Sequence, residues 1–348
     1  MKSRLLELLV CPHCLGSFSC RTDEERDGEI WSGRLYCACG SYPVLRFIPR
    51  LIDEYRTPAG NATSPGASPP LDGEDGDVFA RTRKSFGYQW TAFGKMSSTF
   101  ERNFLDYIGP IAPSFFPRKL GLDAGCGFGR HIYHARRFGA EMVGLDASRA
   151  IDVARANAHS ANTHFVQADL LKPPFRSGTF DFVYCLGVLH HLPDPESGFR
   201  ALAKLKREGG SFWIWVYSKK RPVVNALIEG VRFVTTWLPL RTLHALSYTA
   251  AALDFGLFVA PARALRGTGL SRFVPPRLRL YADYPFQVSV ADWFDRLAAP
   301  VRFYYDEQDL RGWAERVQWS DYRVEPTGLY GFKLQSVVNE SCAALQAP

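Results

Sequence analysis

The chain has 348 residues, of which 46% are hydrophobic and 22% charged, a composition typical of a folded globular protein and not of a disordered chain. Most of its net charge of +7 comes from residues 219–272, which contain eight basic residues and only two acidic residues, Glu229 and Asp254. This excess indicates an acidic partner, whether a substrate, a lipid surface or a nucleic acid. The basic residues are Lys219, Lys220, Arg221, Arg232, Arg241, Arg263, Arg266 and Arg272.

The first ten residues do not resemble a targeting segment. Glu7 interrupts the apolar run Leu5–Val10, which is shorter than the apolar core of a signal peptide. We expect a cytoplasmic protein with no stretch long and pure enough to span a membrane. In that compartment eight cysteines do not predict disulfides, and five of them lie in the first 39 residues, which favours metal binding.

Two cysteine pairs predict a zinc site near the N-terminus. The four candidate ligands are Cys11, Cys14, Cys37 and Cys39. Four thiolates on two turns make a closed tetrahedral site, and the metal would supply folding energy to a unit too small to bury much core. The second pair is C-x-C and therefore tight, so His13 or Cys20 could replace a ligand. A ribbon that folds without metal remains an alternative.

The same segment resembles the Trm112-like zinc-ribbon family. The resemblance rests on LLVCPHC at residues 8–14, GRLYCACGSYPV at 33–44 and IPRLI at 48–52, although the family usually has C-x-x-C in its second knuckle. We therefore predict a ribbon domain over residues 1–52. A segment rich in proline, glycine and serine follows at 53–77 and predicts a flexible linker. Residues 78–348 form the second predicted domain.

A glycine-rich loop marks the second domain. The apolar run Leu120–Asp123 is followed by glycines at 125, 127 and 129 and by a helical pattern from Arg130, which predicts strand, tight turn and helix. The spacing G-x-G-x-G differs from the dinucleotide fingerprint, and no Lys-Ser or Lys-Thr follows as in a phosphate-binding loop. Asp123 would repel a phosphate and attract a cation. S-adenosylmethionine fits, because it carries an ammonium and a sulfonium and no phosphate.

The next predicted strands end in acidic residues in the same order. Asp146 closes an apolar strand about twenty residues on, where related folds bind ribose hydroxyls. Asp169 closes a third strand, Phe180–Cys185 is a fourth, and Ser211–Tyr217 is a fifth. With the turn HHLPDP at residues 190–195, this series resembles the class I S-adenosylmethionine-dependent methyltransferases, and most closely the broad type-11 group.

The resemblance implies an α/β fold with a doubly wound, seven-stranded Rossmann-like sheet whose last two strands are Tyr322–Glu325 and Tyr330–Val337. It places the cofactor at the carboxyl ends of the strands. The implied cofactor-binding residues are Asp123, Gly125, Cys126, Gly127, Asp146, Ala147, Asp169, Leu170, Cys185, Leu186 and Tyr88. His190 and His191 are candidate general bases, because imidazole titrates near neutral pH. A structural or pocket-lining role is the favoured alternative for this histidine pair.

A helical insertion is predicted at residues 220–285. Apolar residues recur at helical spacing over 224–238 and 243–257, and Pro239 and Pro261 are expected to end these two helices. The insertion would form a lid over the substrate. Basic side chains expected to face the ligand are Lys219, Lys220, Arg221, Arg263 and Arg266.

Two absent motifs narrow the range of molecules that could accept the methyl group. Cys185-Leu186-Gly187-Val188 stands where enzymes that methylate exocyclic amino groups have Asn/Asp-Pro-Pro-aromatic, and Cys185 is not preceded by the proline of pyrimidine-attacking enzymes. We therefore predict a methyltransferase for a small organic acceptor, anionic or lipid-like. One alternative is a tRNA or rRNA methyltransferase that uses its ribbon for recognition; another is a non-catalytic cofactor-binding scaffold. The oligomeric state stays open.

Overall fold

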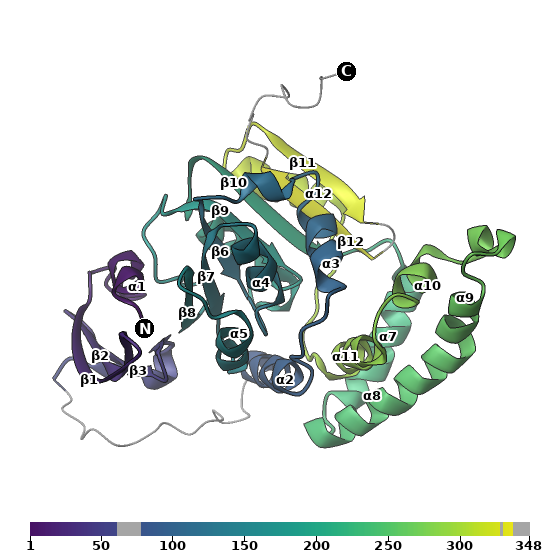
Figure 1. The fold of residues 1–348 in the computed structure, drawn as a ribbon, viewed down its shortest axis with the longest axis horizontal. Helices are drawn as coiled ribbons and strands as arrows, with labels where there is room; N and C mark the ends of the chain where they lie inside the picture. Colours follow the sequence, from purple (N-terminus) through teal and green to yellow (C-terminus); the bar gives the residue numbers. More distant parts are fainter. Residues whose placement is uncertain (61–77, 328–329, 337–348) are drawn as a thin grey trace.

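The computed structural model describes residues 1–60, 78–327 and 330–336. Its centre is a mixed sheet in the order β8-β7-β6-β9-β10-β12-β11 (Figure 1). Strands β6 to β10 are parallel, and β12 runs antiparallel to both β10 and β11. The strands are β6 Leu120–Ala124, β7 Glu141–Asp146, β8 Thr163–Ala168, β9 Phe180–Leu186, β10 Lys206–Tyr217, β11 Tyr322–Thr327 and β12 Gly331–Ser336.

Helices cover both faces of this sheet, which explains why its strands read as nearly continuous apolar runs. On one face Val183 and Cys185 of β9 point into a core shared with α6 and α12, whereas Phe182 and Tyr184 point to the other face. Successive side chains along the strand therefore point into the two cores in turn. The covering helices and short turns are α2 Val78–Ala92, α3 Phe100–Ile108, η2 Pro113–Phe115, α4 Arg130–Arg137, α5 Ala150–Ala158, η3 Leu189–His191, α6 Pro195–Ala203 and α12 Glu307–Arg316.

The N-terminal unit continues the central sheet. Strand β4 of this unit pairs in parallel with β8. Arg50 is opposite Gln167, and Leu51 is opposite Ala168. Arg50 is 5% exposed and pairs with Asp152 at 2.7 Å. The unit comprises α1 Ser3–Leu8, β1 Ser19–Arg26, β2 Glu29–Cys37, β3 Gly40–Leu45, β4 Ile48–Leu51, η1 Asp53–Tyr55 and β5 Thr57–Pro58. Because β5 pairs with β3, this unit extends to Pro58, and the predicted linker lies outside the described residues from 61 onward.

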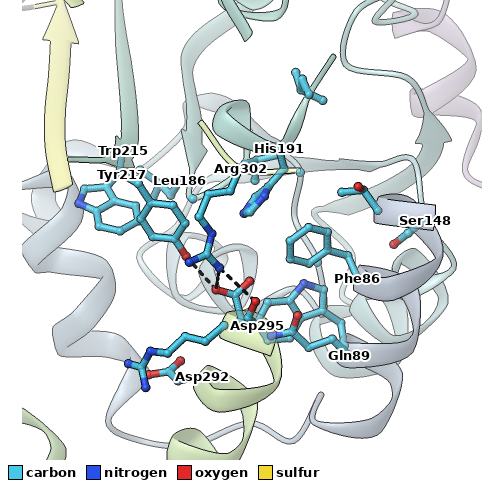
Figure 2. Close-up of a pocket in the computed structure, with 18 of the residues that line it drawn as sticks. Phe86, Gln89, Ser148, Leu186, His191, Trp215, Tyr217, Asp292, Asp295 and Arg302 are labelled. Carbon is cyan, nitrogen blue, oxygen red and sulfur yellow. Dashed lines mark hydrogen bonds and ion pairs between the residues drawn. The ribbon is translucent and has the colours of Figure 1, made fainter. Parts of the chain in front are cut away.

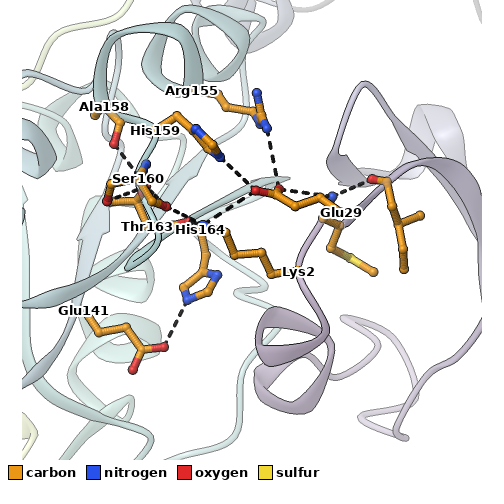
Figure 3. A network of polar contacts seen from close by, with 11 residues as sticks. Lys2, Glu29, Glu141, Arg155, Ala158, His159, Ser160, Thr163 and His164 are labelled. Atoms are coloured by element: carbon orange, nitrogen blue, oxygen red, sulfur yellow. Dashed lines mark hydrogen bonds and ion pairs between the residues drawn. The ribbon is translucent and has the colours of Figure 1, made fainter. Parts of the chain in front are cut away.

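A polar network also joins the N-terminal unit to the central domain. Glu29, on β2, pairs with His159 at 2.8 Å and with Arg155 at 3.5 Å (Figure 3). Lys2 donates to the carbonyl oxygen of Thr163 at 2.9 Å. Together with the β4–β8 pairing, these contacts join the N-terminal unit to one edge of the central sheet.

The insertion is a separate helical layer, drawn in green in Figure 1. It consists of α7 Pro222–Thr235, α8 Leu240–Asp254, a π-helical turn η4 Phe255–Val259, α9 Ala260–Ala264, η5 Gly269–Phe273 and α10 Pro276–Tyr281, followed by α11 Phe286–Ala298. The sequence-based prediction omitted α11, which packs against α2, α7 and α8. Pro261 does not end the preceding helix, because it falls in the first turn of α9 directly after a π turn, where its missing N–H is tolerated.

Within the described part of the chain, one continuous helix, Leu240–Ala264, is long and apolar enough to cross a membrane by length and composition alone. The expectation that no stretch would reach this length was wrong, because the helix continues through the π turn. Length and composition are weak evidence of a span, since core helices of soluble proteins also meet the criterion.

Candidate functional site

The glycine loop after β6 is held tightly between β7 and the turn η3. Gly125, Gly127 and Gly129 have φ of +80°, +52° and +82°, which L side chains rarely adopt. A Cβ atom on Gly125 would lie 2.5 Å from a methyl group of Val188. The backbone N–H groups of Gly125 and Cys126 both donate to the carbonyl of Leu145, at 2.7 and 3.0 Å. Glycine at these positions therefore lets the backbone itself form the cavity wall.

Asp146 fixes the loop to the end of β7. Its Oδ2 accepts from the Gly127 N–H at 2.9 Å, and its Oδ1 accepts from the Ser148 N–H at 2.8 Å and hydroxyl at 2.7 Å. Burial raises its pKa above the ordinary value, while these three hydrogen bonds favour the charged form. A carboxylate has about four acceptor positions, so Asp146, which lines the cavity, can accept one further hydrogen bond from a ligand hydroxyl.

The carboxyl ends of β6, β7, β8 and β9 meet along one side of the cavity, as expected for a doubly wound sheet. Asp169 follows β8, and its Oδ1 accepts from the Leu171 N–H at 2.9 Å, which holds the carboxylate in the turn. The structure brings together eight of the predicted cofactor residues in the cavity lining. They are Gly125, Cys126, Gly127, Asp146, Ala147, Asp169, Leu170 and Leu186.

Three other predicted cofactor residues lie away from the lining. Asp123 is 1% exposed beneath the loop, and burial raises its pKa well above the usual range. Cys185 points to the opposite face of the sheet, because neighbouring residues of a strand alternate. Tyr88 stacks on Phe294 and hydrogen-bonds His244 at 2.9 Å. On the same helix, the cavity is lined instead by Phe86, Gln89 and Trp90.

The cavity continues from the loop toward the insertion and has a volume of about 1260 Å³ (Figure 2). This exceeds the roughly 300–1,000 Å³ of pockets that hold one small ligand, so it can take a cofactor and an acceptor together. Apolar residues of α7 form part of its wall: Val224, Leu227, Ile228 and Val231. Trp215 and Tyr217 of β10 extend the wall from the sheet.

A buried polar cluster, not predicted from the sequence, lies in the same cavity. Asp295 of α11 accepts from the Tyr217 hydroxyl at 2.9 Å and from Arg302 at 2.7 Å (Figure 2). Burial opposes its ionisation, but Arg302, the Tyr217 hydroxyl and other neighbours together outweigh that effect and lower the pKa of Asp295. Asp292 is one helical turn before it and contacts Tyr281. The spacing of Asp292 and Asp295 on an apolar helix was a sequence signal for this cluster.

The two histidines of the turn η3 occupy different environments. His191 lines the cavity and contacts the ring of Phe86, whereas His190 is fully buried and packs against Tyr217 at a ring distance of 4.0 Å. Neither ring nitrogen of His190 has a hydrogen-bond partner among the described residues. The structure therefore favours a packing role for His190 and leaves His191 as the residue that can touch a ligand.

The tautomer of His191 follows from its neighbour. Nδ1 is 2.6 Å from the carbonyl oxygen of Val301, which only accepts, so Nδ1 carries the proton and Nε2 has a free lone pair. Burial lowers the pKa of His191 to about 4, so its ring is neutral at pH 7.

Most of the basic side chains expected to face the ligand have protein partners instead. Lys219 pairs with Asp309 at 2.6 Å, and Arg263 donates to the carbonyl of Ala282 at 3.0 Å. Arg266 contacts Asp283. Of the five predicted residues, Arg221 is the one that the structure places in the cavity lining. Arg130, not predicted, lines the cavity beside the rings of Trp90 and Phe128.

The four predicted metal ligands form one cluster. Their sulfur atoms lie within 4.8 Å of one another, with Cys11 and Cys39 at 3.4 Å. A tetrahedral zinc with Zn–S bonds of about 2.3 Å holds its sulfurs roughly 3.8 Å apart, so the cluster is compatible with this geometry. His13 instead contacts Asp53 at 2.6 Å, and Cys20 is not part of the cluster.

S-adenosylmethionine fits the cavity by the chemistry of these groups. Gly125 and Gly127 line the cavity without side chains of their own, and Asp146 and Asp169 offer acceptors at the ends of adjacent strands. The loop has neither the G-x-G-x-x-G spacing that holds a pyrophosphate nor the Lys-Ser or Lys-Thr pair of a phosphate-binding loop.

Comparison with known proteins agrees with this geometry. A family model described as a methyltransferase domain matches residues 122–214. The ubiquinone biosynthesis O-methyltransferase of Pectobacterium atrosepticum is 30% identical over 166 residues, 47% of this chain and 64% of the relative. That of Ralstonia nicotianae is 30% identical over 179 residues, 50% of this chain and 70% of the relative.

The chain spans between 56% and 64% of the length of five of these O-methyltransferases. Among solved structures, magnesium protoporphyrin IX methyltransferase from Synechocystis is similar with a TM-score of 0.45 and 16% identity, over 74% of this chain and 98% of that chain. The family of the chain follows from its sequence match to the Ralstonia relative, together with the matched methyltransferase domain. The chain belongs to the S-adenosylmethionine-dependent methyltransferases.

Proposed function

We propose that the protein transfers the methyl group of S-adenosylmethionine to a small, largely apolar organic acceptor that carries negative charge. One observation carries the proposal: a single cavity connects the glycine loop and Asp146 with the apolar wall of α7 and with Arg221. The O-methyltransferase names of the relatives support an oxygen atom as the acceptor.

The residues at the strand ends would hold the cofactor. Asp146 would accept a hydrogen bond from a ribose hydroxyl, and Asp169 one from the adenine amino group. Arg130, at the end of the loop, could pair with the carboxylate of the methionine part. When bound, S-adenosylmethionine supplies an electrophilic methyl group on a positively charged sulfur. The protein contributes orientation and exclusion of water, which account for much of the rate of such a displacement.

On the acceptor side, Leu227, Ile228 and Val231 offer apolar contact, and Arg221 offers a positive charge. His191 Nε2 would accept a hydrogen bond from the acceptor hydroxyl, because the Val301 carbonyl fixes the proton on Nδ1. With a pKa of about 4 the ring is a weak base, so this contact orients the hydroxyl.

The experiment that tests the proposal follows the methyl label. Protein and S-adenosylmethionine labelled in the methyl group are incubated with three fractions of a cell extract: RNA, solvent-extractable compounds and water-soluble small molecules. Label in either small-molecule fraction supports the proposal. Label in RNA, with binding that weakens steeply as salt is added, would overturn it in favour of an RNA methyltransferase. Cofactor binding without label in any fraction would favour the non-catalytic scaffold.

We also propose that Cys11, Cys14, Cys37 and Cys39 hold one structural zinc ion. The support is the compact four-sulfur cluster, which provides no open position for a substrate.

A further inference from the structure

We propose that the helical insertion docks on the surface of a membrane that contains anionic lipids. In this arrangement a lipid-soluble acceptor passes from the membrane into the cavity; this second part rests on the proposed methyl transfer. The docking surface is defined here as the exposed apolar side chains of residues 223–273.

The exposed apolar side chains are concentrated in this segment. Among the described residues, 17 large hydrophobic side chains are exposed, and 13 of them lie between Val223 and Phe273. Phe233, Trp237 and Phe273 are the most prominent aromatic members, at 79%, 72% and 71% exposure. Single exposed apolar residues are ordinary on a soluble protein, but a concentration of this kind marks an interaction surface.

The packing of the helices favours docking along a membrane over crossing it. Leu243, Ser247 and Ala251 form the buried face of α8, which packs against α11, whereas Leu246, Leu253 and Leu257 are exposed. A helix held by one face to a folded domain cannot be surrounded by lipid. With one face packed and the other apolar and free, α8 suits the interfacial position of an amphipathic helix.

The basic side chains of the insertion favour a membrane surface with anionic lipids. Residues 219–272 carry eight basic and two acidic side chains. Lys219, Arg232 and Arg266 pair with acidic residues of the protein, which leaves other basic side chains to face a partner. Arg241 and Arg272 are exposed among the apolar residues, and the guanidinium of Arg272 lies 4.9 Å from the ring of Phe273. Basic side chains beside an apolar surface attract anionic lipid headgroups.

The docking surface reaches the mouth of the cavity. Leu227 and Val231 are 66% and 51% exposed, and both also line the cavity. On α7 they are four residues apart and therefore on one face, together with Val223 and Val234. An apolar acceptor could thus move from lipid along α7 to the cavity without crossing water.

The test is flotation of the full chain with lipid vesicles of phosphatidylglycerol and phosphatidylcholine, compared with vesicles of phosphatidylcholine alone. We expect binding to the anionic vesicles. The triple variant Phe233→Ser/Trp237→Ser/Phe273→Ser should weaken it by about tenfold or more, because it removes the apolar contact area. Arg241→Gln/Arg272→Gln should weaken binding to anionic vesicles by roughly tenfold.

The matched control is Leu15→Ser/Tyr36→Ser, which removes two exposed apolar side chains outside the insertion and should leave vesicle binding unchanged. Thermal melting checks that every variant is folded. Equal binding by the triple variant would overturn the proposal. So would the absence of vesicle binding together with a concentration-dependent dimer, abolished by the triple variant, in sedimentation velocity.

The docking and the methyl transfer can fail separately. Label in a small-molecule fraction without vesicle binding would overturn the docking and leave the proposed function standing. Vesicle binding with label confined to water-soluble compounds would support the docking and overturn the delivery of a lipid-soluble acceptor.

Discussion

Asp295 and Arg302 form a buried ion pair of 2.7 Å in the cavity wall, and Tyr217 donates to the same carboxylate oxygen at 2.9 Å. The Arg302 side chain is 5% exposed and that of Asp295 17%. The pair fastens α11 to the chain that returns to the sheet, so the insertion and the central domain share this wall.

Asp295→Ala should therefore destabilise the fold. It leaves the guanidinium of Arg302 buried without its partner, and breaking such a pair costs about 3–5 kcal/mol. Urea denaturation measures the loss. The exposed pair Glu307–Arg311 provides the control: Glu307→Ala should cost less than about 1 kcal/mol. Equal losses for the two variants would contradict a structural role for the Asp295–Arg302 pair.

Asp146→Ala should weaken cofactor binding at least about tenfold, since each hydrogen bond to a charged group contributes roughly 1.5–3 kcal/mol before water compensates. Isothermal titration calorimetry with S-adenosylmethionine measures the effect. Asp321→Ala, an exposed acid outside the cavity lining, should bind like the wild type. Unchanged affinity in a folded Asp146→Ala protein would remove Asp146 from the site.

His191 should make stability fall between pH 7 and pH 5. Its pKa is lowered from 6.5 to about 4, so the unfolded chain binds the proton more readily than the folded protein. The part of the free energy of unfolding that depends on a neutral His191 is fully present above pH 6.5 and is lost as pH falls toward 4. By pH 5 the free energy of unfolding has fallen by about 2 kcal/mol. His191→Gln should give a shallower slope in urea unfolding across this range. An identical slope would show that His191 is not held neutral by burial.

Zinc should copurify at about one ion per chain through the four-cysteine cluster. Cys39→Ser should lose the metal, as measured by elemental analysis of protein purified without chelator. Cys20→Ser is the matched control, because Cys20 lies outside the cluster and should retain zinc. Wild-type protein with no zinc above background would support the alternative of a ribbon that folds without metal.

The local motifs were readable from the sequence because their chemistry depends on neighbours in the chain. Glycines at 125, 127 and 129 predict a turn with positive φ, and acids that end successive parallel strands must meet at one edge of the sheet. The cysteine pairs indicated a cluster for the same reason: each knuckle brings its own two sulfurs together.

Tertiary packing decided the rest. The alternation of β9 turns Cys185 away from the cavity, and the orientation of α2 points Tyr88 at α8 and Trp90 at the loop. The register of β4 against β8, which joins the ribbon to the sheet, and the pairing of Asp295 with Arg302 depend on contacts between distant segments. Such contacts are set by the complementarity of whole surfaces, which periodicity and spacing along one chain do not contain.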